Sequence, residues 1–260
     1  MTPQQSENAA SALSAARKNN NMMAGLENGL TPATMDEAYA IQDAFMRIWD
    51  EPIVGWKVAA TAEMIQQIYR VDEPFCGPFY APTTFASPAT PNAEAFGYYC
   101  IESEFAFRFG STLAARESTI GREEILDAIE AALPAFELIS PRFDTLLEDR
   151  AALAAADCAL NGGFVLGQDY ADWRSLDFAA HPVRLSVDSE VVKEGTSANV
   201  LGHPFNALDW LVNTLSRRGI DLNAGDVVST GTCTGIVHLQ QGQNAVADYG
   251  ALGRVEVTFI

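Results

Sequence analysis

The order of helix-like and strand-like segments is the feature that most restricts the fold of this chain. After Gly162-Gly163 the sequence consists of short β-type runs, at 164–167, 183–187, 226–230 and 254–259. One amphipathic helix interrupts them, beginning at Pro204 and ending at Gly219, as proline-in, glycine-out boundaries predict. Strands therefore do not alternate regularly with helices, as a doubly wound sheet would require. The pattern predicts an α+β fold with a β-rich core and peripheral helices.

The part of the chain before Gly162 predicts helices around three strands. We expect helices at 4–18, 35–49, 62–69, 122–133 and 146–156, and strands at 53–60, 98–109 and 135–139. Thr34 followed by Glu37 is a capping box for the second helix. The stretch 81–95 is rich in Pro, Thr and Ala and predicts irregular surface chain. We expect an N-terminal helical region at 1–80, which holds the first core strand and the Lys57 loop, and a β-rich catalytic core at 81–260, the two forming one functional unit.

The charge balance excludes several classes of partner. The 260 residues carry 34 acidic and 16 basic side chains, a formal net charge of -18, which repels phosphate backbones and anionic lipid surfaces. The four cysteines are scattered without a C-x-x-C pair, which argues against a zinc knuckle or a disulfide framework. No stretch approaches the roughly 18 apolar residues of a membrane span, and the N-terminus lacks the apolar run of a signal peptide. We expect a cytoplasmic protein that binds neither nucleic acid nor membrane.

A pair of glutamates within an apolar strand is the strongest candidate for a functional site. Glu102 and Glu104 lie two residues apart, so their side chains share one face of the strand, about 7 Å apart. Taken alone, they would be the solvated side of an amphipathic strand. Glu137, between Phe136 and Leu138, repeats the situation in a second strand. Buried like charges are costly without a cation, and three carboxylates without His or Cys favour Mg²⁺ or Mn²⁺.

Two further features accompany the glutamates. Lys57 is the one charge in the strand at 53–60 and is either a snorkelling side chain or a proton shuttle in a carboxylate-metal pocket. The segment 225–232, with sequence GDVVSTGT, is a strand that runs into a Gly/Thr turn. Such a turn exposes N–H groups and hydroxyls that can hold a carboxylate, although an ordinary strand-to-loop transition has the same sequence character.

These motifs together resemble the 2-keto-4-pentenoate hydratase group of the fumarylacetoacetate hydrolase superfamily, which includes 2-oxohepta-3-ene-1,7-dioate hydratase and 4-oxalocrotonate decarboxylase. The likeness runs from about residue 34 to the end and follows the order DEAYAIQ at 36–42, GWKVAAT at 55–61, DEP at 72–74, the Glu-x-Glu pair, FEL at 136–138, GFVLG at 163–167, LGHP at 201–204, WL at 210–211 and GDVV at 225–228.

The resemblance implies a fumarylacetoacetate-hydrolase-like core of mixed sheets and a divalent metal, Mg²⁺ or Mn²⁺. It assigns the metal to Glu102, Glu104 and Glu137 and catalysis to Lys57, with Glu73 as a candidate for part of the acid function. The same likeness assigns substrate binding to Thr61, Thr230, Gly231 and Thr232. It further implies a homo-oligomer, a complex with a sister pathway enzyme, and a 2-oxo acid substrate from the meta-cleavage of aromatic compounds.

The sequence departs from the resembling hydratases at four positions, one of which is Gln243, where the family's late Gly-Asp has become Gly242-Gln243. Phe75 follows Glu73-Pro74 where many hydratases have an acid, and Cys158 and Leu160 replace the usual Asn and Ser. The metal ligands are retained while their surroundings differ. Hydration of a 2-hydroxy-2,4-dienoate is the predicted reaction, with decarboxylation of a 4-oxalocrotonate-type acid as the alternative. Acylpyruvate hydrolysis ranks third, because it uses a His-Glu pair that His181, His203 and His238 do not form recognisably, and a non-catalytic subunit ranks last.

Overall fold

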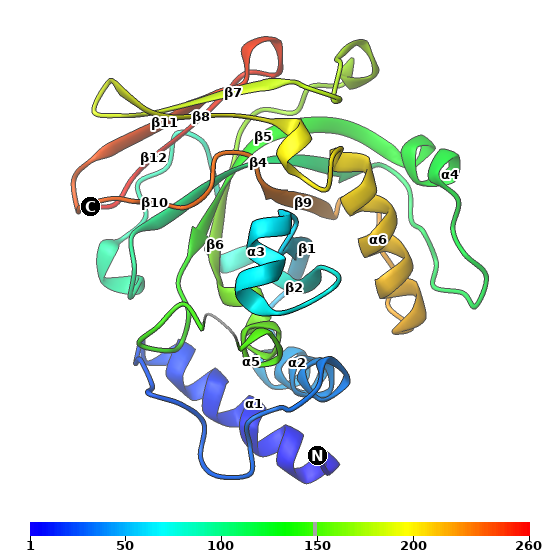
Figure 1. Ribbon diagram of the computed structural model, residues 1–260, viewed down its shortest axis with the longest axis vertical. Coiled ribbons are helices and arrows are strands. Elements are labelled where there is room, and N and C mark those ends of the chain that lie inside the picture. Colours follow the sequence, from blue (N-terminus) through cyan, green and yellow to red (C-terminus); the bar gives the residue numbers. More distant parts are fainter. Residues whose placement is uncertain (148–149) are drawn as a thin grey trace.

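The core of the molecule is one large curved sheet, seen in the centre of Figure 1. The structure is a computed structural model that describes residues 1–147 and 150–260. In the large sheet the strands run in the order β2-β1-β9-β4-β5-β6-β3, and β10 pairs with β4. Their bounds are β1 Ile53–Ala59, β2 Phe75–Tyr80, β3 Thr84–Ala86, β4 Cys100–Phe109, β5 Ile129–Ile139, β6 Asn161–Leu166, β9 Val227–Thr232 and β10 Val237–His238.

A second, smaller sheet lies across one end of the large one, at the top of Figure 1. Its strands run in the order β12-β11-β7-β8, with bounds β7 Pro182–Val187, β8 Glu190–Thr196, β11 Asn244–Asp248 and β12 Arg254–Thr258. Tyr249, fully buried after β11, joins the sheets: its hydroxyl lies 3.0 Å from the Glu104 carbonyl oxygen and 3.2 Å from that of Ala135. The mixed sheets with peripheral helices confirm the predicted α+β, fumarylacetoacetate-hydrolase-like class.

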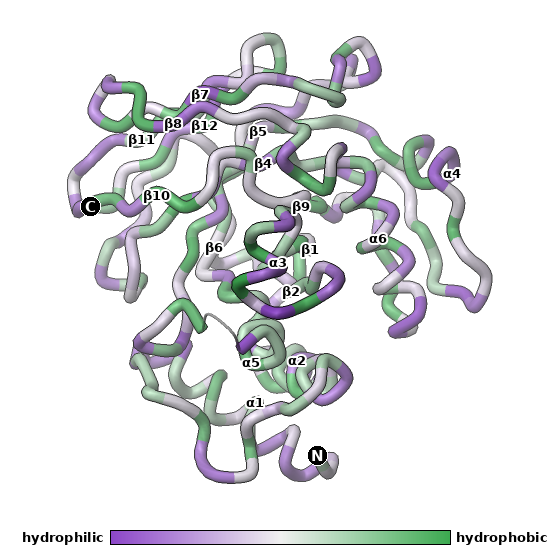
Figure 2. The backbone as a smooth tube through the Cα atoms, viewed as in Figure 1, coloured by the Kyte–Doolittle hydropathy of each residue, from purple (hydrophilic) through white to green (hydrophobic). Residues whose placement is uncertain are grey.

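The helices lie outside the sheets. Their bounds are α1 Pro3–Lys18, α2 Met35–Trp49, α3 Glu63–Tyr69, α4 Arg122–Asp127, α5 Ala151–Ala156 and α6 Pro204–Arg217. Figure 1 shows α1, α2 and α5 together at the end opposite the small sheet. Figure 2 colours α5 toward the hydrophobic end of the scale, and five of its six residues are buried, so this Ala-rich helix fills the space beneath α2. Within the described residues, no helix is both long enough and apolar enough to cross a membrane.

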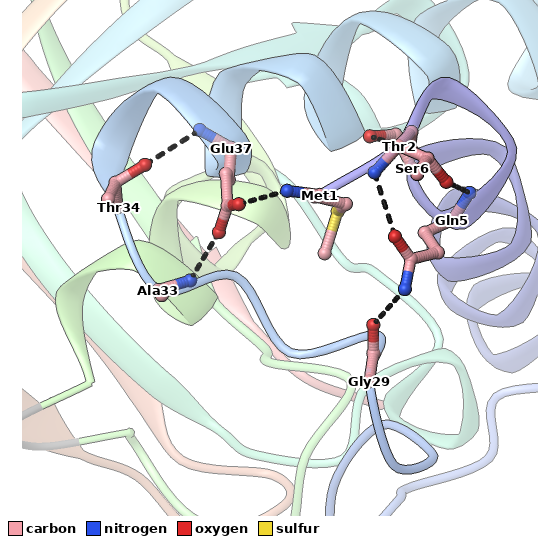
Figure 3. A network of polar contacts seen from close by, with 8 residues as sticks. All are labelled: Met1, Thr2, Gln5, Ser6, Gly29, Ala33, Thr34 and Glu37. Atoms are coloured by element: carbon pink, nitrogen blue, oxygen red, sulfur yellow. Dashed lines mark hydrogen bonds and ion pairs between the residues drawn. The ribbon is translucent and has the colours of Figure 1, made fainter.

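The N-terminus of α2 shows how a local sequence signal sets a helix boundary. Thr34 Oγ1 accepts a hydrogen bond from the Glu37 amide at 3.2 Å, as the capping box predicts. The Glu37 carboxylate, however, accepts from the Ala33 amide at 2.8 Å and from the Met1 amino group, as Figure 3 shows. These two donors lower the pKa of Glu37. The cap therefore also connects α2 to the start of α1.

Several predicted boundaries were wrong. The helix expected at 122–133 ends at Asp127, and β5 begins at Ile129, because the alanines that follow pair with β4. The stretch 81–95, expected to be irregular, contains β3, which pairs with β6. The helix expected at 146–156 covers only α5, and residues 148–149 lie outside the described residues. Strands β2, β8, β10 and β11 were not predicted, whereas α2, β1, β4 and α6 match closely.

Candidate metal centre

The register of three neighbouring strands brings the predicted carboxylates together. Glu102 of β4 lies directly opposite Glu137 of β5, and Glu104 is opposite Thr232 of β9. Because side chains alternate along a strand, all three glutamates project from the same face of the sheet. One carboxylate oxygen from each lies within 4.8 Å of the others. The sheet thus brings the three residues named from the sequence into one cluster.

Lys57 reaches this cluster across the concave face of the sheet. Its Nζ lies 2.8 Å from Glu137 Oε2 and donates to the Ala159 carbonyl oxygen at 3.0 Å. β1 and β5 are three steps apart in the sheet order, which corresponds to about 14 Å in a flat sheet. The ion pair therefore requires the sheet to curl until side chains from non-adjacent strands meet. Lys57 is 4% exposed and Glu137 is fully buried.

Two polar residues that the sequence did not single out hold the glutamates in place. Ser229 Oγ donates to Glu104 Oε2, and the Gly231 amide donates to the same oxygen at 3.1 Å. Asn161 Nδ2 donates to Glu137 Oε1 at 3.2 Å. Ser229 lies within the segment 225–232, and Asn161 directly precedes the paired glycines, but neither position signals its contact in the sequence alone.

The protein itself does not balance the negative charge of the cluster. Burial and the charge of Glu137 raise the pKa of Glu102 to about 7. Burial, with the charges of Glu137 and Glu102, also raises the pKa of Glu104 well above its ordinary value. Burial lowers the pKa of Lys57, but the three carboxylates outweigh it and the net shift is upward. One ammonium thus faces three carboxylates, and a divalent cation would balance the remaining negative charge.

The donor atoms fit such a cation. Glu104 Oε1 is buried and has no hydrogen-bond partner among the described residues, although its other oxygen accepts two hydrogen bonds. A buried carboxylate oxygen without a donor is costly unless it has a ligand of its own. The three side chains offer oxygen alone, the donor set that hard cations such as Mg²⁺ and Mn²⁺ prefer.

A cavity of about 100 Å³ opens directly beside the cluster. Glu102, Lys57, Thr61 and Thr232 line its polar end. The remaining wall is mainly apolar and comes from α3, β2, the end of β5 and the turn before β6. Glu102 is the one glutamate of the cluster that lines the cavity, so a ligand there would meet the cluster through this residue.

A strained turn forms one wall of this cavity. Cys158, Ala159 and Leu160 all have left-handed backbone angles, with φ of 51°, 56° and 64°. Each such non-glycine residue costs on the order of 1 kcal/mol. The turn packs against Gly77, where an added Cβ would lie 2.2 Å from the Cys158 carbonyl oxygen. This geometry points the Ala159 carbonyl at Lys57 and places Leu160 in the cavity wall.

The other residues assigned from the resemblance fall in different places. Thr61 and Thr232 line the cavity. The Thr230 hydroxyl donates to the Phe105 carbonyl oxygen at 2.8 Å, so it belongs to the sheet. The Gly231 amide donates a hydrogen bond to Glu104 Oε2. Glu73 is not brought to the cavity: its carboxylate accepts from Trp210 Nε1 at 3.1 Å in a separate groove.

None of the three histidines lines the cavity. His203 caps α6 by accepting from the Phe205 amide at 3.1 Å, which confirms the helix-entry role expected for it. His181 Nε2 lies 2.7 Å from the Tyr249 carbonyl oxygen, and His238 Nδ1 lies 3.0 Å from Cys100 Sγ. The His-Glu pair that would activate water in a hydrolase is therefore missing from the described part of the cavity.

A curled sheet with a carboxylate triad, a lysine beside it and an adjoining cavity is the arrangement of an enzyme that uses a divalent metal. Residues 79–260 match the profile of the C-terminal domain of fumarylacetoacetate hydrolase, which is more than half of the chain. The chain belongs to the fumarylacetoacetate hydrolase family, as the sequence motifs indicated.

Hydratases and a decarboxylase are among the proteins that this chain resembles. The 2-keto-4-pentenoate hydratase of Paraburkholderia xenovorans (strain LB400) is 31% identical over 262 residues, covering 100% of this chain and 96% of the relative. The 2-oxo-hept-4-ene-1,7-dioate hydratase of Escherichia coli is 26% identical and covers 87% of each chain. The 4-oxalocrotonate decarboxylase of Pseudomonas putida G7, complexed with magnesium and adipate, superposes with a TM-score of 0.91 at 25% identity, covering 100% of this chain and 99% of that one.

Proposed function

We propose that this protein is a divalent-metal-dependent hydratase of a 2-hydroxy-2,4-dienoate or 2-oxo-enoate in the catabolism of aromatic compounds. The observation that carries the proposal is the triad of Glu102, Glu104 and Glu137, of which Glu102 lines the polar end of a cavity and Glu137 pairs with Lys57. The full-length likeness to 2-keto-4-pentenoate hydratases supports the reaction class.

The triad would hold Mg²⁺ or Mn²⁺, and the bound cation would withdraw electrons from the C1 carboxylate and C2 oxygen of the substrate and so stabilise its dienolate form. Ser229 and Asn161 keep the carboxylates in position through their hydrogen bonds to Glu104 and Glu137. Thr61 and Thr232 supply hydroxyls at the same end of the cavity, where they can bind the carboxylate or a water molecule.

Lys57 is the group that can hold and move a proton. Its raised pKa keeps Nζ protonated at neutral pH, and the Ala159 carbonyl fixes its direction. Ketonisation of a dienol needs a proton at the far end of the conjugated system, and the subsequent addition of water to the enone needs one near C3. We assign this proton transfer to Lys57 and leave Glu73, which is bonded to Trp210, outside the chemistry.

Decarboxylation of a 4-oxalocrotonate-type acid is the second candidate. Phe75, fully buried within the cavity wall, stands where the resembling hydratases have an acid, and decarboxylation requires no group to position water. The structural likeness to 4-oxalocrotonate decarboxylase supports it. Hydrolysis of acylpyruvates has no such support, because no histidine lines the described cavity.

One assay separates the candidates. The protein with Mn²⁺ is incubated with 2-hydroxypenta-2,4-dienoate and, separately, with 2-oxohex-3-enedioate, while dienol absorbance and carbon dioxide are followed. We expect loss of the dienol with formation of a 4-hydroxy-2-oxo acid, and no carbon dioxide from the diacid. Carbon dioxide from the diacid without turnover of the dienoate would reverse the assignment, and no turnover of either would favour a non-catalytic subunit.

We also propose that the protein self-associates, as the resemblance implies. The outer strand of the small sheet, β8, exposes Val191 and Val192, with relative exposures of 53% and 44%, and an uncovered edge strand with apolar side chains favours pairing. Sedimentation velocity of the wild type and of Val191→Lys tests this. If the wild type sediments as a monomer, the protein does not self-associate. A complex with a sister enzyme is a separate proposal, tested by co-purification with the decarboxylase or hydratase of the same pathway.

A further inference from the structure

Beyond its polar end, the part of the cavity wall that the structure describes has no charged side chain. Large apolar side chains from six separate places in the chain contribute to it, namely Ile65, Ile68, Phe75, Ile139, Leu146, Leu160 and Ile236. Tyr69 adds its ring, packed edge-on against Phe75 at 5.4 Å, while its hydroxyl donates to the Leu146 carbonyl oxygen. The side chains in this part of the cavity wall are thus apolar, and the Tyr69 hydroxyl is hydrogen-bonded to the Leu146 carbonyl oxygen.

The charged side chains in the described lining, Lys57 and Glu102, both lie at the polar end of the cavity. Among the described lining residues, Lys57 is the only cation, and it is already bonded to Glu137 and the Ala159 carbonyl. Glu102 is the only lining anion. A second carboxylate at the apolar end would lose its hydration without gaining a charged or hydrogen-bonding partner, which disfavours it strongly. An alkyl or aryl group there would release water from apolar surface instead.

We propose that this cavity selects 2-oxo acids with one carboxylate and an apolar chain, and discriminates against dicarboxylates of the same length. The selectivity rests on the proposed function, because it takes the C1 carboxylate and C2 oxygen to lie at the metal end. It extends that function by specifying the tail: an unbranched alkyl or phenyl substituent beyond C4. Phe75 and Leu160, two positions where the sequence departs from the resembling hydratases, contribute this lining.

Binding of saturated, unreactive 2-oxo acids tests the tail separately from catalysis. The Mn²⁺-loaded protein is titrated calorimetrically with 2-oxohexanoate and with 2-oxohexanedioate, which differ only in the distal carboxylate. We expect the monoacid to bind at least about tenfold more tightly. Equal or tighter binding of the diacid would overturn the selectivity while leaving the metal site and the hydratase proposal intact. Failure of both acids to bind would overturn the proposed function and the selectivity together.

A charge introduced into the wall gives an independent test. Leu160→Arg places a cation in the apolar wall, and the left-handed backbone already carries a non-glycine residue there. We expect the preference to shift toward the diacid by at least about tenfold. Met64→Arg is the matched control, because Met64 is 66% exposed on α3 and does not line the cavity. Circular dichroism verifies folding, and Phe75→Arg replaces Leu160→Arg if that variant does not fold. A correctly folded wall variant with unchanged preference, or an equal shift in Met64→Arg, would refute the assignment of the tail to this wall.

Discussion

Lys57 Nζ lies 2.8 Å from Glu137 Oε2, although the strands that carry these residues are three steps apart in the sheet. Both side chains are buried, and the pair closes the concave face of the sheet beside the carboxylate cluster. The ion pair depends on the curvature of the sheet, because a flatter sheet would separate the Lys57 ammonium from the Glu137 carboxylate. Four predictions test this centre.

Removing the ammonium should affect both stability and turnover. In Lys57→Met we expect the free energy of unfolding of the metal-free protein to fall by about 3–5 kcal/mol, because Glu137 loses its buried partner. We expect kcat to fall at least about 100-fold, the usual minimum for a proton-transfer group. Chemical denaturation and dienol absorbance measure the two effects. Lys193→Met on the exposed strand β8 is the control. If Lys57→Met turns over substrate as fast as the wild type, Lys57 takes no part in the chemistry.

Divalent cations should bind through the triad. We expect millimolar Mg²⁺ or Mn²⁺ to raise the Tm of the wild type, and Glu102→Gln to weaken Mn²⁺ binding at least about tenfold, because one of three anionic ligands becomes neutral. Isothermal calorimetry and thermal scans give the affinities. Glu130→Gln, an exposed position on the same strand as Glu137, should behave as wild type. A Tm that does not respond to either metal would contradict the site.

The metal-free protein should become less stable as the pH rises from about 4.5 to 7. The pKa of Glu102 is raised to about 7 and that of Glu104 well above 4.5, so the folded state binds protons more tightly than the unfolded state. Stability then falls with increasing pH over this window. A bound cation offsets the cost of ionising these buried carboxylates. The gain in Tm on adding Mg²⁺ should therefore grow from pH 5 to pH 8. In Glu102→Gln the Tm gain on adding Mg²⁺ should change less with pH. A wild-type gain that is independent of pH would contradict the prediction.

Gly231 should not tolerate a side chain. Its φ of 110° disfavours other residues, and an added Cβ would lie 2.0 Å from Thr61 Oγ1. We expect Gly231→Ala to lower the free energy of unfolding by about 1–3 kcal/mol and to weaken metal binding, because the Gly231 amide holds Glu104. Gly121→Ala, where no atom lies within 4 Å of the added Cβ, is the control for denaturation experiments. Equal stabilities of the two variants would show that this contact relaxes freely.

The sequence predicted the elements whose local signals agree with their tertiary role. Thr34 caps α2, Pro204 begins α6, and Glu102 and Glu104 share a face of β4, all as expected. The errors lie where tertiary pairing overrides propensity. Ala131 and Ala132 favour a helix by composition, yet they pair with β4 in the middle of the sheet.

β2 was missed for a related reason. Pro78 makes the segment resemble a loop, and it is tolerated because β2 is the outer strand of the large sheet. The curl of the sheet likewise has no local signal, so the sequence could name Lys57 and Glu137 without predicting that they touch. Neither could it separate Glu73, bonded to Trp210, from the residues that reach the cavity.

The left-handed turn at Cys158–Leu160 has a consequence for how this enzyme can diversify. The turn holds Lys57 through a main-chain carbonyl, that of Ala159, whereas it faces the substrate tail through a side chain, that of Leu160. A mutation at residue 160 can thus remodel the tail pocket while leaving the lysine's anchor in place. The turn therefore fixes the catalytic lysine through a main-chain atom that side-chain substitutions do not remove, so residue 160 can vary while Lys57 keeps this hydrogen bond.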